Sequence, residues 1–212
     1  MKVLTVSDEI VPALHSPALF EYARGVEMIL ACGDLPAEYL EYLVSLLNVP
    51  MFYVLGNHDD AERPPEGGEN VNLRVVEARG LLIAGLEGAP RYNTKPHFQY
   101  TENQMRAHIA ALIPALMVNK ARYGRYLDIL LTHAPPYKIH DGEDYAHRGF
   151  KSFRWFIEHY QPRYLIHGHT HVYDKRDETI TQHGATTVIN TVGYKILDIP
   201  VITPSQRTQR NK

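Results

Sequence analysis

Five short polar motifs, each at the end of a short apolar run, constrain this chain more than any other feature. In chain order they are Asp8, Gly33-Asp34, Gly56-Asn57-His58-Asp59, His133 and Gly168-His169-Thr170-His171. Because open α/β sheets hold their ligands at the carboxyl ends of strands, apolar runs that end in this way predict one shared site at a sheet rim. Carboxylate, amide and imidazole groups together bind divalent metals. The motifs therefore predict a metal site built from distant segments.

The first part of the chain predicts an alternation of strands and helices. Strands are expected over residues 2–6, 27–31 and 51–55. A helix capped by Ser16, with Pro17 at its first position, and an amphipathic helix over residues 36–47 that ends at Asn48 lie between them. This alternation favours a largely parallel sheet with right-handed crossovers.

The rest of the chain predicts further strands, two more helices and a surface loop over residues 60–70. The strands are expected over residues 73–76, 81–85, 127–131, 163–166, 186–190 and 195–199. Thr101 opens a long helix that Pro114 breaks or kinks, and residues 152–160 form another helix. We expect a single domain over residues 1–203 and a polar tail over residues 204–212.

Composition excludes several classes of protein. With 22 basic and 24 acidic residues the formal charge is −2, so an extended nucleic-acid surface is not indicated. The one cysteine, Cys32, cannot form an internal disulfide, which favours a reducing compartment. No apolar stretch is long enough for a membrane helix or a signal peptide, so we expect a cytoplasmic protein without membrane contact. Oligomerisation is left open.

With its motifs in this order, the chain resembles the calcineurin-like metallophosphoesterase superfamily. The pattern of that superfamily is Asp-x-His, Gly-Asp, Gly-Asn-His-Asp or -Glu, a single His, and Gly-His-x-His. The resemblance runs from Ser7 to His171. It implies an α/β sandwich in which two central mixed β-sheets are flanked by helices.

The resemblance also implies a role for each matched residue. Asp34 would be the carboxylate that bridges two divalent metals. One metal site would be completed by Asn57, His133 and His169, and the other by Asp8 and His171. The residue types suit manganese, iron or zinc and do not select among them.

His58 and Asp59 are the expected catalytic pair. Water activated by metal would attack phosphorus, and His58 would protonate the leaving oxygen or stabilise the transition state. Asp59 would orient His58 by accepting its other ring proton.

The first motif departs from the superfamily pattern, because Ile10 stands where the pattern has histidine. Glu9 is not expected to replace it, since alternate residues of an extended strand point to opposite faces. We therefore expect one firmly bound metal and a second, weaker one.

Loops are expected to choose the substrate. Arg91 and Tyr92 could bind a phosphate oxygen, and a second wall could come from residues 137–148. Without room for a cap domain, the cleft suits a small or nucleotide-like phosphodiester. The first hypothesis is thus a phosphodiesterase, and a nuclease fits the charge less well. The alternative is a binding or scaffold protein whose site has weakened, as Ile10 suggests.

Overall fold

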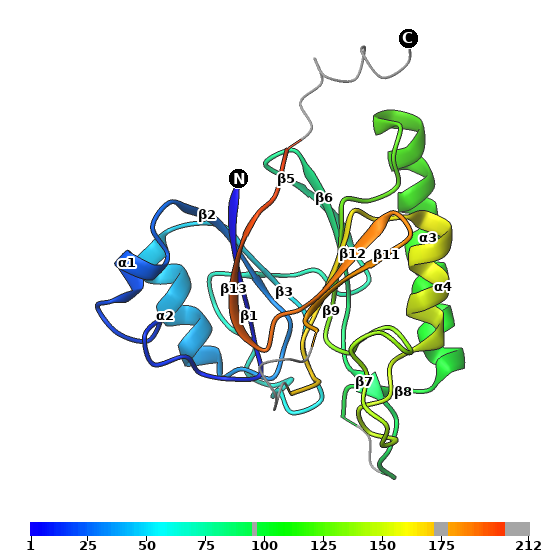
Figure 1. Cartoon of the computed structure of the whole chain (residues 1–212), viewed down its shortest axis with the longest axis horizontal. Helices are drawn as coiled ribbons and strands as arrows, with labels where there is room; N and C mark the ends of the chain where they lie inside the picture. The colour runs from blue at the N-terminus through cyan, green and yellow to red at the C-terminus, as the bar shows by residue number, and fades with distance from the viewer. Residues whose placement is uncertain (95–96, 172–177, 202–212) are drawn as a thin grey trace.

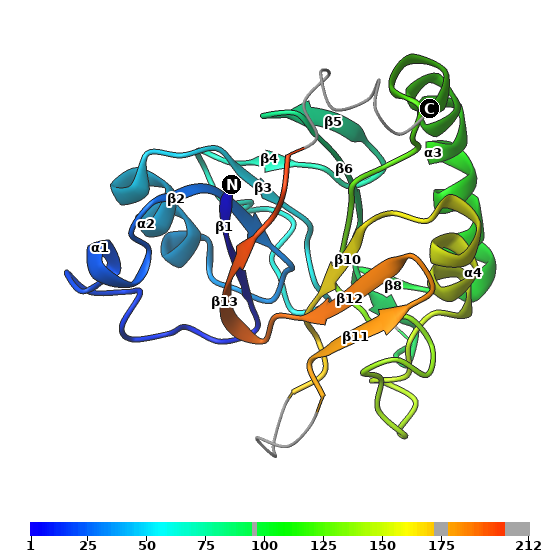
Figure 2. The ribbon, with the colours of Figure 1, turned by 45° about the horizontal axis from the view of Figure 1, so that its top comes forward.

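Two β-sheets face each other at the centre of the molecule, with helices on their outer sides (Figures 1 and 2). The computed structural model describes residues 1–94, 97–171 and 178–201. One sheet has five strands in the order β13-β1-β2-β3-β4, and the other has six in the order β11-β12-β10-β9-β6-β5. Helices α1 and α2 lie beside the first sheet, and α3 and α4 beside the second (Figure 1). The predicted α/β sandwich is confirmed.

The strands are short and most are buried. The five-stranded sheet consists of β1 (Lys2–Ser7), β2 (Val26–Ala31), β3 (Met51–Tyr53), β4 (Glu69–Asn70) and β13 (Gly193–Asp198). The six-stranded sheet consists of β5 (Val75–Ala78), β6 (Leu81–Leu86), β9 (Ile129–Thr132), β10 (Tyr164–His167), β11 (Ile180–His183) and β12 (Thr186–Asn190). A separate pair is formed by β7 (Ala89–Pro90) and β8 (Gln99–Tyr100). The helices are α1 (Leu19–Tyr22), α2 (Ala37–Leu47), α3 (Glu102–Tyr123) and α4 (Lys151–Tyr160).

Both sheets are mixed, and their parallel parts carry the polar motifs. Strands β1 to β4 are parallel, and β13 is antiparallel to β1. In the other sheet β6, β9, β10 and β12 are parallel, and β5 and β11 are antiparallel to their neighbours. The expectation of a largely parallel arrangement thus holds for the strands that precede motifs. Parallel strands place their carboxyl ends on the same side of a sheet.

The core fills three layers. Apolar residues from both sheets, among them Leu30 and Ile166, pack together between the sheets. A second cluster joins α2 to the five-stranded sheet through residues such as Leu40. A third joins α3 and α4 to the six-stranded sheet and includes Leu116 and Phe153. Strands covered on both faces read as continuous apolar runs, which explains why the sequence signals them clearly.

Several elements differ from expectation: the two-residue strands β4, β7 and β8 were not predicted, and α1, α3 and β11 differ more clearly. Helix α1 is a single turn that begins at Leu19, whereas the sequence predicted a start directly after Ser16. The Ser16 hydroxyl accepts a hydrogen bond from the Ala18 backbone N–H at 3.2 Å, within the turn that precedes the helix. Helix α3 passes through Pro114 without ending, because its buried side chains pack on the sheet on both sides of that residue. Strand β11 was not predicted, since its residues alternate only between exposed and half-buried. The expected tail lies outside the described residues.

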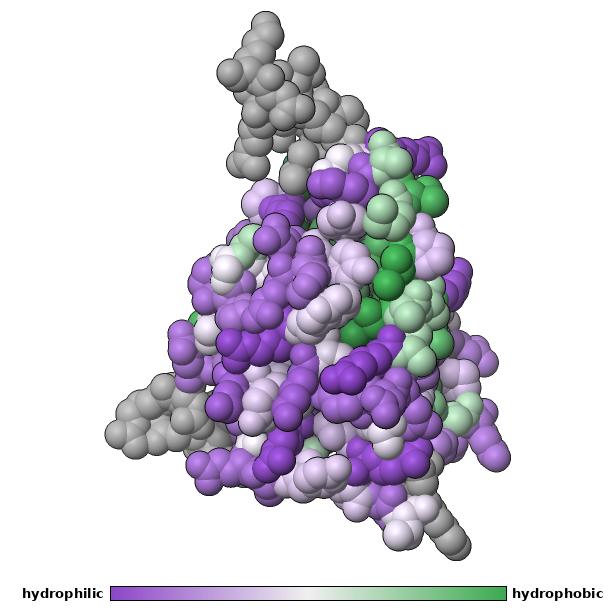
Figure 3. All heavy atoms as spheres, turned by 90° about the vertical axis from the view of Figure 1, so that its right-hand side faces the viewer, coloured by the Kyte–Doolittle hydropathy of each residue, from purple (hydrophilic) through white to green (hydrophobic). Residues whose placement is uncertain are grey.

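The outer face of α3 and α4 carries an apolar strip (Figure 3). The large apolar side chains that these helices expose are Met117, Val118 and Trp155, which are 52%, 62% and 43% exposed. In the part of the chain that the structure describes, no helix combines the length and the apolar character that crossing a membrane requires.

Candidate metal centre

Asp34 stands at the centre of the site, in the turn that follows β2. Both Gly33 and Asp34 adopt left-handed backbone conformations, with φ of 92° and 56°. One carboxylate oxygen of Asp34 accepts a hydrogen bond from the backbone N–H of His58 at 2.8 Å. A Cβ on Gly56 would lie 2.1 Å from that oxygen, so this position requires glycine. The Gly-Asp and Gly-Asn-His-Asp motifs therefore fit together as one unit.

His133, which follows β9, directs one ring nitrogen at two oxygens. Its Nδ1 lies 2.7 Å from the carbonyl oxygen of Cys32, which can only accept, so Nδ1 carries a proton. Its Nε2 lies 3.1 Å from Asn57 Oδ1 and 3.3 Å from Asp34 Oδ2. Asn57 donates from its Nδ2 to the Tyr92 hydroxyl at 3.1 Å, which fixes Oδ1 toward His133. Two oxygen acceptors and an imidazole nitrogen thus converge, and such a set suits a cation.

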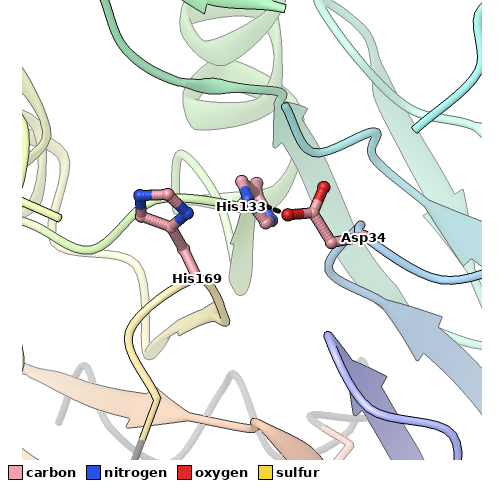
Figure 4. A group of neighbouring side chains, drawn as sticks. All are labelled: Asp34, His133 and His169. Atoms are coloured by element: carbon pink, nitrogen blue, oxygen red, sulfur yellow. Dashed lines mark ion pairs between the residues drawn. The ribbon is translucent and has the colours of Figure 1, made fainter. Parts of the chain in front are cut away.

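His169 completes a group of three possible ligands. It follows β10, has a φ of 66° and is 5% exposed. Its Nε2 donates to the Ala146 carbonyl at 2.9 Å, which leaves Nδ1 as the unprotonated nitrogen. Asp34, His133 and His169 offer ligand atoms that all lie within 4.8 Å of one another, and the three side chains project toward a common point from separate loops (Figure 4). The donors fit a divalent metal.

The electrostatics of this group also favour a cation. Burial disfavours charge on His133, but the carboxylates of Asp34 and Asp8 outweigh it and raise its pKa to about 9. Burial also works against the Asp34 carboxylate, yet His133 holds the pKa of Asp34 at about 2. Burial and the nearby His133 lower the pKa of His169 to about 3, so its imidazole is neutral. Asp34 is therefore ionised and His169 neutral, as metal ligands must be, whereas His133 holds a proton that a metal would have to displace.

The residues expected at the second metal are less closely grouped. The Asp8 carboxylate accepts from the backbone N–H of His169 at 2.9 Å and from the Ser7 hydroxyl. His171 has its Nδ1 3.5 Å from a carboxylate oxygen of Glu9. Among the described residues, the group of three ligands with atoms within 4.8 Å includes neither Asp8 nor His171.

Glu9 lies on the side of the site, which the alternation of an extended strand did not predict. Strand β1 ends at Ser7, and Asp8 has a φ of 62°, so the period of two stops before Glu9. The carboxylate of Glu9 is thereby turned to His171. Ile10 is 46% exposed.

Asp59 does not bind His58, contrary to expectation. Its two oxygens accept from the backbone N–H groups of Asp34, Leu35 and Gly56 at 2.8, 3.1 and 2.7 Å. In the described part of the chain no hydrogen bond joins its carboxylate to the exposed His58 ring. Asp59 instead ties the turn after β2 to the turn after β3, because one carboxylate can satisfy several backbone donors.

The loop residues reach the site from two directions. Tyr92 contacts Asn57 through its hydroxyl, whereas the Arg91 guanidinium donates to Gln104 Oε1 at 3.1 Å. From the other loop, the His147 ring lies 5.1 Å from the His169 ring, centroid to centroid, and its Nδ1 is 2.8 Å from an Asp144 oxygen. The sequence predicted that residues 137–148 form a wall of the substrate site, without indicating which of them contact the metal ligands. The contact of Ala146 with His169 carries no sequence signal, because it uses a backbone carbonyl.

The fold and this site define a class of protein: an α/β sandwich with a ligand set for divalent metal at the ends of its parallel strands. The model of the calcineurin-like phosphoesterase family matches residues 3–173, and the chain belongs to that family. Membership implies metal-dependent hydrolysis of phosphate esters and divalent metal ions as cofactors.

Solved structures share the fold. The protein TT1561 from Thermus thermophilus superposes with a TM-score of 0.64 at 19% identity, over 93% of each chain. GAP50 from Plasmodium, described as the anchor in the inner membrane complex, has a TM-score of 0.50 at 13% identity, over 90% of this chain and 70% of its own. No curated protein sequence matches this chain.

Proposed function

We propose that this protein is a phosphodiesterase that hydrolyses a small or nucleotide-like phosphodiester with the help of divalent metal. The observation that carries the proposal is the convergence of Asn57, Asp34 and His133, with His169 beside them, in a group whose ligand atoms suit a divalent cation. Family membership supports phosphoester hydrolysis in general. The preference for a diester is our inference from the site.

Asp34, Asn57, His133 and His169 would hold the firmly bound metal. Asp8, Asp34 and His171 would hold a weaker one, and manganese, iron and zinc all suit these donors. When bound, divalent metals at such sites neutralise charge on phosphoryl oxygens and make water more acidic. The His133 and His169 rings are held by the carbonyls of Cys32 and Ala146, so the ring nitrogens that would bind metal already face the site.

His58 is the proposed general acid. Its backbone N–H binds Asp34, which fixes its position relative to the metal ligands, while its side chain is exposed. An exposed imidazole beside the site can give a proton to the oxygen that leaves phosphorus. Asp59 supports this step as a positioning residue, because it holds the turn on which His58 sits.

A diester fits the charge of the site better than a monoester does. Three carboxylates, those of Asp8, Asp34 and Asp59, surround the ligand group, and each interacts electrostatically with His133. A diester carries one negative charge, and a monoester carries about two near neutral pH. The diester therefore meets less repulsion. Tyr92, which contacts Asn57, would reach the phosphate from the loop after β7, and Arg91 lies beside it.

The test is hydrolysis of bis(p-nitrophenyl) phosphate and of p-nitrophenyl phosphate in manganese, with metal content measured on the same protein. We expect faster turnover of the diester, loss of hydrolysis after chelation, and a loss of at least about 100-fold in kcat for His58→Ala with metal content unchanged. Arg24→Gln, an exposed substitution beside α1, is the matched control. Unchanged hydrolysis by His58→Ala would refute the acid assignment.

A second candidate function is binding without catalysis. It is favoured by Ile10, which places an apolar side chain where the family pattern has a metal-binding imidazole. In that case the protein would bind metal at Asp34 and hydrolyse neither ester. Metal content with no turnover of either substrate is the result that separates a scaffold from the proposed enzyme.

A further inference from the structure

A cavity of about 380 Å³ is lined by residues that neighbour those in contact with the candidate metal centre. It opens between the start of α3 and the segment that leads into α4. The residues that matter for its chemistry are Arg91, Tyr100, Glu102, Tyr145, Arg148 and Lys151. Its volume falls in the range of small-molecule sites, about 300 to 1,000 Å³.

The charge of this cavity is positive. Arg91, Arg148 and Lys151 form no ion pair with a carboxylate anywhere in the described residues, although Arg148 and Lys151 lie over the rings of Tyr145 and Tyr137. The acidic residue of the lining, Glu102, is engaged elsewhere. Its oxygens accept the first backbone N–H groups of α4, including that of Ser152 at 3.2 Å.

Arg91 has hydrogen-bonding capacity left over. One terminal nitrogen donates to Gln104 Oε1 at 3.1 Å. Its Nε is buried and has no acceptor among the described residues. A buried guanidinium N–H without a partner is costly, and the residue that carries it lines the cavity.

Both walls of the cavity continue directly into the metal centre. On one wall Tyr92, the residue after Arg91, contacts Asn57. On the other, Ala146 binds His169 through its carbonyl and His147 lies against the His169 ring. A ligand with one group at the metal centre can therefore extend into the cavity along residues that neighbour both.

We propose that this cavity binds a phosphate group of the substrate other than the one that is hydrolysed, together with the flat organic part that carries it. The inference rests on the proposed function and adds the substrate class: a nucleotide-like phosphodiester with a second phosphate. Arginine pairs with phosphate through two parallel hydrogen bonds. A monatomic anion such as chloride cannot accept both in this geometry, so phosphate is favoured. The rings of Tyr100 and Tyr145 supply a stacking surface beside the cations.

The test is the binding of three probes to the full chain by calorimetry, in manganese and again after chelation: adenosine 5′-monophosphate, adenosine and inorganic phosphate. Of the three probes, we expect adenosine 5′-monophosphate to bind the chelated protein most tightly. It contacts both the basic side chains and the tyrosine rings of the cavity. Arg148→Gln and Lys151→Gln should each weaken its binding about tenfold, and Arg148→Lys should weaken it less. Arg24→Gln, outside the cavity, should change nothing, and melting temperatures check that all variants fold.

Two results overturn the inference. One is equal binding of the nucleotide by the parent chain, Arg148→Gln and Lys151→Gln. The other is binding of inorganic phosphate as tight as that of the nucleotide, which would leave a plain anion site. Neither result touches the proposed hydrolysis. Conversely, nucleotide binding that depends on Arg148 in a protein that hydrolyses no ester would refute the proposed function and leave the cavity assignment standing.

Discussion

Asp59 illustrates how a motif residue can serve the site without contacting its neighbour in the sequence. Its carboxylate joins two loops through three backbone donors, those of Asp34, Leu35 and Gly56. Burial raises the pKa of this carboxyl, and the hydrogen bonds from Gly56 and Asp34 oppose that rise. The position of Asp34 at the metal centre therefore depends on Asp59.

Replacing Asp59 should reduce stability as well as activity. Asp59→Ala leaves three partly buried N–H groups without an acceptor, so we expect a loss of about 3 kcal/mol in the free energy of unfolding. Asp59→Asn keeps one acceptor oxygen and should lose less. His58→Ala is the control, because its exposed ring holds no loop together. Denaturant titrations measure the difference, and an Asp59→Ala protein as stable as the parent would contradict the account.

Glu9 shows where strand periodicity stops being a guide. The rule that placed it away from Asp8 holds only while the backbone is extended, and the left-handed Asp8 ends that condition. The carboxylate of Glu9 beside His171 is therefore available to the weaker metal that we propose.

Substitutions at Glu9 and Ile10 should change the content of the second metal in opposite directions. Glu9→Gln removes a charged oxygen and should weaken that metal about tenfold, whereas Ile10→His adds an imidazole and should strengthen it. The measurement is manganese content by mass spectrometry after desalting, with electron paramagnetic resonance to detect coupled ions. Lys2→Gln is the control, since Lys2 lies at the opposite end of β1. Identical manganese content in all four proteins would exclude both roles.

Among the elements, those with continuous apolar runs or clear caps were predictable from sequence. Helix α2 runs from Ala37 to Leu47, with Asn48 left-handed at its end as its composition indicates. Thr101 begins α3 as predicted, and the structure shows that it forms a capping box with Gln104. Strand β11 was not predicted because its exposed and half-buried residues show no apolar alternation, although it forms a hairpin with β12. The turn at α1 was misplaced because the helix has only four residues. The polar motifs were enough to predict where the site lies. The pairing of Glu9 with His171 could be recognised only from the left-handed backbone of Asp8.

Pro114 is an exposed residue in the interior of α3, and its ring removes one backbone hydrogen bond. Pro114→Ala should restore that bond and the helical geometry around it. We expect a gain of about 1 to 3 kcal/mol in the free energy of unfolding, with hydrolysis unchanged. Pro17→Ala, before α1, is the control and should bring no gain. A loss of stability in Pro114→Ala would mean that the packing of α3 requires a bend at this residue.

For the molecule as a whole, the two sheets bring together carboxylates and histidines that the chain separates by more than a hundred residues. The contact between Asp8 and His169 spans 161 positions, and that between Cys32 and His133 spans 101. The site therefore exists only when both sheets are packed, and metal binding should stabilise the folded chain.

A chain of hydrogen bonds also links the six-stranded sheet to the loop after β9. His140 Nδ1 lies 3.1 Å from His167 Nε2, and His140 Nε2 lies 2.8 Å from the Thr181 hydroxyl. His167 Nδ1 lies 2.9 Å from the Gly168 carbonyl, which makes it a donor. With Nδ1 as donor, His167 accepts at Nε2 from His140 and is neutral, while His140 Nε2 can either accept from Thr181 or donate to it. Burial lowers the pKa of His167 to about 3 and also lowers that of His140.

Acid should therefore weaken the fold through this pair. Below about pH 6.5 the unfolded chain binds protons that the folded chain does not. As the pH is lowered, the free energy of unfolding therefore decreases by up to about 1.4 kcal/mol per pH unit for each histidine. In His140→Gln one of these histidines is gone, so the loss on acidification should be smaller, although the variant is less stable at pH 7. Nearby Glu178 and Lys195 act on His140 with opposite signs and remain in the variant. Denaturant titrations of both proteins from pH 7.5 to pH 5, in chelator, measure the two slopes. Parallel slopes would show that His140 titrates alike in the folded and unfolded states, which contradicts the lowering of its pKa by burial.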